Sequence, residues 1–466
     1  MTDADVAGLH AWLADHEAEL LSDYQELLRF PTLEAEAEPG APFGAANKQA
    51  LDWMLAKAAT AGMRTTDIEG YCGYAEFGSG EKMVMSLGHL DVVPVGTGWK
   101  HDPFGADIDD GYVYARGACD DKGPTMAMFY ASRAVLALHP DIDVRIRNVF
   151  GCNEESGFKC VHRYMETEEP PTLGVAPDAG WPCVYAEKGI GNFVIGYRPA
   201  VGKLTLLSLE GGSRPNIVID KATARVRVVA DWRPTVDARL ADWFDKNVTT
   251  NWEGDVLVID AVGKASHGAY PHGGDNAGTR CLRLLRALAP TEQETEFENL
   301  LDLPDISGHG AGIAGADEIT HLTLNMGIVQ TVGEEIQFTL NVRYPVTWKG
   351  ADLLAKCEKR MAKLGGQWRI VSFDDSPSLY FPLDHPLVKT IIEVHHAETG
   401  ETKEPGVMGG GTYARAVPNC VAIGTAWDGD GPAHEPDERL KVDHLFKMSR
   451  IYAHLLLRLA EAAKAM

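Results

Sequence analysis

Short runs of apolar residues alternate along the chain with longer stretches in which apolar positions recur every three or four residues. The short runs predict strands of a largely buried sheet, and the longer stretches predict helices. The expected strands cover residues 82–90, 143–152 and 419–427. The expected helices cover residues 46–62, 123–139 and 442–463. This alternation favours an α/β fold with a mixed, mostly parallel sheet and helices on both faces.

The pattern changes between residues 188 and 383. Segments such as "KATARVRVVADWRP" and "EEIQFTLNVRYPV" alternate apolar and polar residues, which is typical of half-exposed antiparallel strands. We therefore expect an α+β domain inserted into the first domain. The insert is longer than a usual single domain, so it has room for two lobes. The predicted first domain comprises residues 1–187 and 384–466, and the predicted insert comprises residues 188–383.

The N-terminal segment has an acidic amphipathic pattern that predicts a helix ended by Pro31. It lacks the basic start and the apolar stretch of a secretory signal. No apolar run in the sequence approaches the roughly 18 residues that a membrane span requires. We therefore expect a cytoplasmic protein. The formal net charge of −24 makes nucleic acids and anionic membranes poor partners.

Several common chemistries lack support in the sequence. The eight cysteines are scattered without a C-x-x-C pair, so we interpret them as reduced, buried thiols rather than as a zinc ribbon or a disulfide framework. The sequence has neither a phosphate-binding loop with its lysine nor a G-x-S-x-G elbow, which leaves phosphoryl transfer and serine hydrolysis unsupported. The stretch "GAGIAG" follows no predicted strand, so a flexible loop is favoured over a dinucleotide site.

Polar side chains interrupt the pattern where predicted strands end. His89 and Asp91 stand at the end of a buried strand, where a purely structural strand would favour valine or leucine. Residues two apart in a strand point to the same face, so one side chain could hold a cation while the other orients it. Further polar positions follow in the same manner. They are Asp120 with Asp121, Glu154 with Glu155, Asp178, and His434.

Each of these positions also has an ordinary structural interpretation. The paired aspartates could form a solvated turn that caps the next helix, and the paired glutamates could be favourable acidic residues in a first helical turn. His434 alone would be an ordinary loop histidine. Their joint occurrence favours a site, because positions that follow the strands of one sheet converge on one edge. Two imidazoles and three carboxylates suit a pair of divalent cations, and one glutamate is left for proton transfer.

Five motifs, in this order, resemble those of the M20 family of co-catalytic metallopeptidases. They are "GHLDVVP", "GACDDKGP", "NEESG", "PDAGWP" and "AHEPDE". The resemblance extends over essentially the whole chain, and PepV-type, Xaa-His-dipeptidase-like enzymes are the most similar group. It implies a catalytic α/β domain interrupted by a lid domain. In PepV-like relatives the lid has two similar lobes, one of which replaces a partner subunit, so a monomer is favoured and a homodimer stays open.

The resemblance also implies which residues bind metal. The implied ligands are His89 and Asp178 for one ion, Glu155 and His434 for the other, and Asp120 as the bridge between them. Asp91 would accept a hydrogen bond from the far nitrogen of the His89 ring and so fix its tautomer. A cis peptide bond between Asp120 and Asp121 is implied as well.

Glu154 is the implied general base. Metal ions lower the pKa of a bound water towards about 7, so a nearby carboxylate can take its proton at neutral pH. The resulting metal-bridging hydroxide would attack the amide carbonyl. Glu154 would then return the proton to the departing amine.

The resemblance implies substrate contacts in both domains. His267, in "GKASHGAYPHGGDNA", would donate a hydrogen bond to the oxyanion. The implied substrate-binding residues are Asn216, Arg343, Gly410 and Arg415. Asn216 would lie near the oxyanion, and the planar guanidinium of Arg343 suits a free C-terminal carboxylate. The glycines around Gly410 would let backbone amides approach a ligand. Without the resemblance, Arg343 would be an ordinary surface charge and Asn216 a turn cap.

The sequence therefore predicts a two-metal dipeptidase that acts on dipeptides or short peptides with a free C-terminus. Zinc is the expected metal, with manganese and cobalt as alternatives, because oxygen-rich sites with two histidines accept all three. An N-acyl amino acid deacylase or desuccinylase of the same family would use the same ligands. A non-catalytic metal-binding relic is a further alternative, although such relics commonly lack the base or a ligand.

Overall fold

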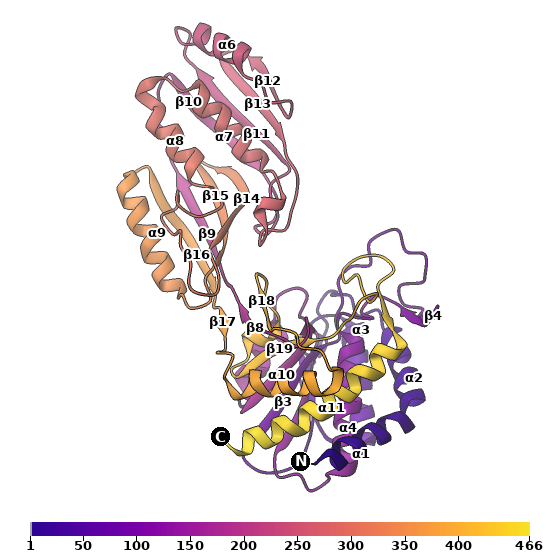
Figure 1. Cartoon of the computed structure of the whole chain (residues 1–466). Helices are drawn as coiled ribbons and strands as arrows, with labels where there is room; N and C mark the ends of the chain where they lie inside the picture. Colours follow the sequence, from indigo (N-terminus) through magenta and orange to yellow (C-terminus); the bar gives the residue numbers. More distant parts are fainter. Residues whose placement is uncertain (1) are drawn as a thin grey trace. The chain divides into compact units, whose positions relative to one another are not determined.

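The computed structural model describes residues 2–466, and the chain divides into two compact units (Figure 1). The first unit combines the described residues up to Ala186 with Phe381–Met466. The second unit is Glu187–Tyr380. The second unit is thus one continuous segment, whereas two segments from opposite ends of the chain build the first.

A mixed sheet forms the centre of the first unit. Seven of its nine strands follow the order β1 (Arg64–Ile68), β2 (Cys72–Phe77), β6 (Arg145–Gly151), β3 (Met83–His89), β7 (Leu173–Ala179), β19 (Cys420–Gly424) and β8 (Cys183–Glu187). The four strands β6, β3, β7 and β19 run parallel, and the strands outside them pair antiparallel. The carboxyl ends of four neighbouring strands therefore share one edge. The predicted mixed α/β fold is confirmed.

Helices cover both faces of this sheet. Adjacent residues of β6 point to opposite faces. Asn148 accepts a hydrogen bond from Ser132 of α4 (Lys122–Leu138), whereas Arg147 donates one to Tyr164 of α5 (Lys159–Thr167). The other helices of this unit are α1 (Asp3–Asp15), α2 (Glu17–Leu28), α3 (Ala45–Thr60), α10 (Pro386–Thr399) and α11 (Val442–Lys464). Burial on both faces explains why β3 is an almost continuous apolar run.

The N-terminal helix is interrupted, which the sequence pattern did not predict. Helix α1 ends at Asp15, and α2 begins at Glu17 and ends at Leu28, before Pro31. His16 leaves the helical conformation, with φ −115° and ψ 8°. Its Nδ1 lies 2.7 Å from the Trp12 carbonyl oxygen and its ring stacks on Trp12. A side chain that binds the carbonyl of the preceding turn competes with the helix backbone and ends it.

The second unit is an antiparallel sheet with helices. Its strands follow the order β12 (Val248–Glu253), β13 (Val256–Val262), β11 (Lys221–Val228), β10 (Leu204–Gly211), β14 (Thr323–Val332), β15 (Glu335–Tyr344), β9 (Gly189–Tyr197) and β16 (Trp368–Ser376). Strands β10 and β14 share a single register pair, so the sheet consists of two four-stranded halves. The predicted α+β insert is confirmed, and its two halves agree with two lobes.

Each half of the second sheet carries its own helices. Helices α6 (Arg233–Asp242), α7 (Ala277–Leu288) and α8 (Glu294–Asp302) belong to the first half, and α9 (Gly350–Leu364) packs on β16 of the second half (Figure 1). The expected half-exposure holds for β11, where exposed and buried residues alternate. It is wrong for β15, where residues on both faces of the strand are buried over most of its length.

Shorter elements complete both units. A small sheet is formed by β20 (Arg439–Lys441), β5 (Tyr112–Tyr114) and β4 (Asp107–Asp109). The remaining elements are β17 (Leu379–Tyr380), β18 (Gly406–Met408) and the 3-10 helices η1 (Pro271–Gly273), η2 (Thr291–Gln293) and η3 (Tyr413–Ala416). All eight cysteines are buried and free, as predicted. Among residues 2–466, no helix is both long and apolar enough to span a membrane.

Candidate metal centre

Parallel strands bring most of the predicted ligands to one edge of the first sheet. His89 is the last residue of β3, and Asp178 lies one residue before the end of β7. Glu154 and Glu155 follow the end of β6 at Gly151. Since β6, β3 and β7 are neighbours, their carboxyl ends place these side chains together.

Asp120 and His434 reach the same edge by another route. Asp120 was expected to follow a strand of the main sheet, but it follows β5 of the small sheet and stands two residues before α4. Its peptide bond to Asp121 is cis, as the resemblance implied. His434 lies in the loop between β19 and β20 and adopts a positive φ of 64°.

The Asp120 carboxylate lies between two imidazoles. Its Oδ1 is 3.1 Å from His89 Nε2, and its Oδ2 is 3.0 Å from His434 Nε2. The same His434 nitrogen lies 3.1 Å from Glu155 Oε1. Each oxygen of one carboxylate thus faces a different histidine, which is the arrangement expected of a ligand shared by two cations.

Potential ligand atoms form two overlapping groups around His89. The first group contains His89, Glu154 and Asp178, and the second contains His89, Asp120 and Glu155. Within each group the ligand atoms lie within 4.8 Å of one another. Glu154, the predicted base, therefore lies beside predicted ligands.

Asp91 makes a different contact from the one predicted. His89 Nδ1 lies 3.0 Å from the main-chain oxygen of Asp91, whereas the Asp91 carboxylate is 3.6 Å away, beyond hydrogen-bonding distance. That carboxylate instead accepts hydrogen bonds from the backbone N–H groups of Glu154, at 3.0 Å, and Glu155, at 3.1 Å. Asp91 thus fixes the His89 ring through its carbonyl and the two glutamates through its side chain.

The electrostatics of the cluster favour positive charge at its centre. Contacts with Asp120 and Glu155 raise the pKa of His434 to about 10. Burial opposes protonation of His89, but Asp120 and Asp91 outweigh it and raise the pKa of that ring. Burial also raises the pKa of Glu154 well above its usual value. The carboxylates thus favour the protonated form of both imidazoles.

This donor set fits divalent metal ions. Imidazole nitrogens and carboxylate oxygens are ligands that zinc, manganese and cobalt accept. A metal ion would supply the positive charge that the protonated histidines otherwise provide, and its binding would release those protons. The fit therefore rests on the chemistry and closeness of the side chains.

Residues 85–458 match the model of the Peptidase family M20/M25/M40. The chain belongs to this family. A Bacillus subtilis protein named "Putative dipeptidase YtjP" is 35% identical over 464 residues, which cover 95% of this chain and 97% of that relative. A Staphylococcus epidermidis protein named "Putative dipeptidase" is 31% identical over 454 residues, which cover 94% of this chain and 96% of that relative.

Solved structures agree with this M20 fold. Human carnosine dipeptidase 1 has a TM-score of 0.55 at 16% identity and covers 98% of this chain and 99% of its own. Aminoacylhistidine dipeptidase from Vibrio alginolyticus has a TM-score of 0.57 at 13% identity and covers 95% of this chain and 96% of its own. The predicted family and its class, a metal-dependent peptidase, are confirmed, whereas the PepV-type group stays a prediction.

Three further predicted residues of this M20 peptidase lie near one another in the second unit. The backbone carbonyl of Asn216 accepts a hydrogen bond from Gly268 N–H at 2.7 Å, next to His267. Burial and the nearby Arg343 charge lower the pKa of His267. Arg343 is only 4% exposed, so it is not an ordinary surface charge; its Nε donates to Asn341 Oδ1 at 3.0 Å.

Gly410 and Arg415 lie in the first unit, on either side of a glycine with a clearer steric need. A Cβ added at Gly410 would only touch Met408 at van der Waals distance. At Gly411 it would lie 2.2 Å from Arg415 Nη1. A side chain at position 411 would thus have to displace the flexible Arg415 side chain, and the substrate roles of Gly410 and Arg415 stay predictions.

Sequence reasoning gave no role to two buried acids next to the centre. Asp121 is fully buried and accepts hydrogen bonds from His89 N–H at 3.1 Å and from the Thr125 hydroxyl at 3.0 Å. Glu438 is buried too and accepts from Asp120 N–H at 3.2 Å. Glu438 ends the "AHEPDE" motif, so its closeness to His434 was the available signal.

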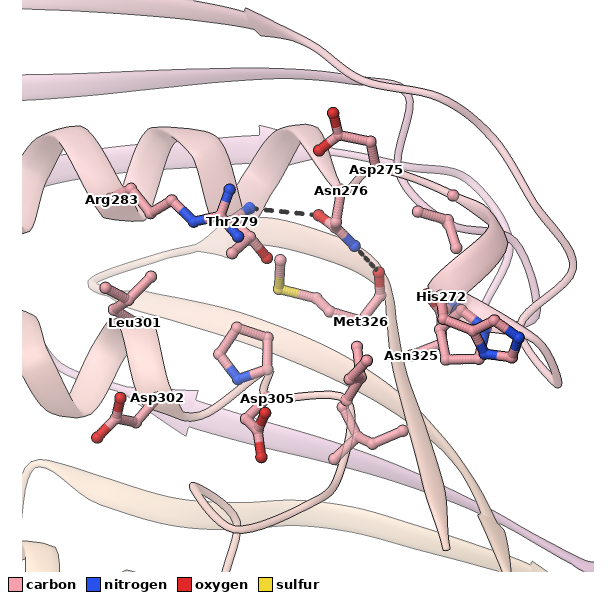
Figure 2. Close-up of a pocket in the computed structure, with 16 residues that line it drawn as sticks. His272, Asp275, Asn276, Thr279, Arg283, Leu301, Asp302, Asp305, Asn325 and Met326 are labelled. Carbon is pink, nitrogen blue, oxygen red and sulfur yellow. Dashed lines mark hydrogen bonds between the residues drawn. The ribbon is translucent and has the colours of Figure 1, made fainter. Parts of the chain in front are cut away.

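A cavity of about 440 Å³ lies in the second unit (Figure 2), and its lining includes Val218 and His272, two and five positions from Asn216 and His267. Figure 2 shows His272, Arg283, Asp305 and Met326 around it. The Asn276 side chain donates a hydrogen bond to the Met326 carbonyl oxygen and accepts one from the Thr279 N–H. None of the predicted site residues lines this cavity.

Proposed function

We propose that this M20 peptidase is a dipeptidase that uses two divalent metal ions to hydrolyse the peptide bond of dipeptides or short peptides. One observation carries the proposal: the two oxygens of Asp120 face two different histidines, at 3.1 Å and 3.0 Å. The dipeptidase names of relatives at 35% and 31% identity support the substrate class.

The proposed metal ligands are those that lie together at the sheet edge. His89 and Asp178 would hold one ion, Glu155 and His434 the other, and Asp120 both. Zinc is the first candidate, with manganese and cobalt as alternatives. When bound, the ions would supply Lewis-acid activation of the scissile carbonyl and of a water molecule.

Glu154 is proposed as the group that moves the proton. Burial raises its pKa, which favours proton uptake, and its carboxylate lies within 4.8 Å of ligand atoms of His89 and Asp178. The Asp91 carboxylate accepts a hydrogen bond from the Glu154 backbone N–H, which fixes the main chain of Glu154 beside the proposed ligands. Once protonated, Glu154 would give the proton to the departing amine nitrogen.

The second unit is proposed to supply the remaining substrate contacts. The lowered pKa of His267 keeps its ring neutral near pH 7, with one N–H available to donate to the developing oxyanion. Asn216 would assist at the same oxygen. Arg343 would bind the C-terminal carboxylate of the substrate, and Gly410 and Arg415 of the first unit would contact its main chain.

A substrate panel combined with metal removal tests this function. The purified protein is treated with a chelator, reloaded with zinc, manganese or cobalt, and assayed on Ala-Ala, Ala-His, N-acetyl-alanine and N-succinyl-alanine. We expect turnover of the dipeptides, lost on chelation and restored by metal. Turnover of the acyl compounds alone would replace the dipeptidase with a deacylase. A metal-loaded protein inactive on all four would favour a binding role.

A further inference from the structure

A buried ion pair lies behind the proposed metal ligands. The Arg116 and Glu438 side chains are each 1% exposed, and Arg116 Nη1 lies 2.8 Å from Glu438 Oε2. The two residues are 322 positions apart in the sequence and belong to the two segments that build the first unit. Neither residue takes part in the proposed reaction.

Glu438 holds the backbone of the loop that presents Asp120. Its Oε1 accepts hydrogen bonds from the N–H groups of Cys119, at 2.9 Å, and Asp120, at 3.2 Å. Its Oε2 accepts from Gly117 N–H at 3.1 Å. Three backbone N–H groups of the loop thus surround one carboxylate, as a backbone nest surrounds an anion. The position of Asp120 therefore depends on Glu438.

Arg116 connects the same loop to two others. Its Nη1 donates to the carbonyl oxygen of Glu435 at 3.2 Å, directly after His434 in the chain. Its Nη2 donates to the carbonyl oxygens of Pro94 and Val95, each at 3.4 Å, in the segment that follows β3. One guanidinium thus joins the segments that carry three of the proposed ligands.

We infer that Glu438 and Arg116 are positioning residues that set the placement of Asp120 relative to His434, and thereby the affinity of the site for its second metal ion. The inference rests on the proposed two-metal site. Hydrogen bonds one step removed from the ligands commonly change metal affinity by about 10–100-fold. The pair makes contacts of this kind to the bridging ligand and to the neighbour of His434.

The variant Glu438→Gln tests this role with Zn²⁺ alone as the probe. It keeps the size of the side chain but turns an NH₂ group towards donors that need an acceptor. We expect two zinc ions per wild-type chain and, in the variant, an affinity for one of them lower by about 10–100-fold in competition with a chelator. The absorption spectrum of bound Co²⁺ should change as well. The variant should also hydrolyse dipeptides more slowly than the wild type, and excess Zn²⁺ should restore part of this activity.

Glu76→Gln is the matched control. Glu76 is also buried, and it is paired with Arg147 at 2.8 Å on neighbouring strands of the same unit. We expect the Glu76→Gln variant to be less stable than the wild type but to bind zinc with wild-type affinity. If Glu438→Gln does not fold, Arg116→Lys, which keeps the charge but not the forked contacts, takes its place.

A folded variant of the pair that binds two zinc ions with wild-type affinity and an unchanged Co²⁺ spectrum would overturn the inference. An equal loss of zinc affinity in Glu76→Gln would overturn it too. A wild-type protein that binds fewer than two zinc ions would instead overturn the two-metal proposal itself, and this inference with it.

Discussion

At the scale of single residues, neighbouring carboxylates have different roles because they contact different groups. Asp120 faces two imidazoles, whereas Asp121 accepts the His89 N–H and the Thr125 hydroxyl. Asp91 was predicted to orient His89, yet its carboxylate holds backbone N–H groups of the next loop. A carboxylate that orients backbone and one that can bind metal look alike in a sequence. Their partners distinguish them.

Replacing the proposed base should separate chemistry from metal binding. Glu154→Gln removes the proton acceptor but keeps the shape of the side chain, so we expect kcat to fall by about 10²–10⁴-fold with metal content unchanged. Steady-state kinetics and metal analysis of the same sample measure both. Glu155→Gln is the comparison, and it should lose metal instead. Full kcat in Glu154→Gln would refute the assigned role.

The proposed carboxylate contact of Arg343 makes a second prediction at this scale. Its Nε is held by Asn341, whose amide donates to Asn192 at 2.7 Å, so the guanidinium is fixed in orientation. Arg343→Lys loses the planar fork, and we expect KM for a dipeptide to rise about 10-fold, as loss of a charge-assisted hydrogen bond requires. The exposed Arg369→Lys serves as control. An unchanged KM would show that another group binds the carboxylate.

At the scale of elements, strand and helix approach so closely that one position admits only glycine. A Cβ at Gly88 on β3 would lie 2.1 Å from Thr125 Oγ1 of α4 and 3.0 Å from Asp121 Oδ2. The close approach lets Asp121 reach the backbone of β3, next to the proposed ligand His89. Packing between β3 and α4 and the position of the metal centre are therefore coupled.

Gly88→Ala should accordingly cost both stability and function. Overpacking of this kind costs about 1–3 kcal/mol, and relief of the clash must move Thr125 or α4. Urea unfolding should show the loss, together with weaker metal binding. Gly366→Ala is the control, because nothing lies within 4 Å of its added Cβ. Equal urea midpoints of unfolding for Gly88→Ala and Gly366→Ala would contradict the packing argument.

At the scale of the whole molecule, the proposed centre joins the two segments of the first unit. His434 comes from the C-terminal segment and the other proposed ligands come from the N-terminal segment. Whatever binds to both segments stabilises their association by mass action. The centre is therefore expected to act on folding as well as on catalysis.

Metal removal should lower the melting temperature. A ligand present at 100 times its Kd stabilises the folded state by about 2.7 kcal/mol, so chelation should remove a contribution of this order for each tightly bound ion. Differential scanning calorimetry before and after chelation, and again after added zinc, measures the change. His434→Gln should show a smaller response. An unaltered melting temperature on chelation would contradict this coupling.

The stability of the chelated protein should depend on pH through His434. Its pKa is about 10 in the folded state against 6.5 for the ordinary side chain, so protonation favours folding. The contribution is complete below pH 6.5 and is lost as the pH rises towards 10. Urea unfolding across this range should show a steeper decline for the wild type than for His434→Gln. The same decline in stability with pH in the wild type and in His434→Gln would contradict the raised pKa of His434.

The sequence by itself determined the fold class, the inserted unit and the residue types of the centre. Apolar runs and their periods indicate burial. Strands that have His89, Asp178 and the two glutamates at or just after their carboxyl ends bring these residues to one edge wherever the sheet is parallel. The pattern could not show the break at His16, the burial of β15 or the true partner of Asp91. Those depend on which groups meet across the fold, and hydropathy does not encode that. The loop contacts of Asp120, His434 and Glu438, across more than 300 positions, were decided by tertiary structure alone, because only packing brings the ends of the chain together.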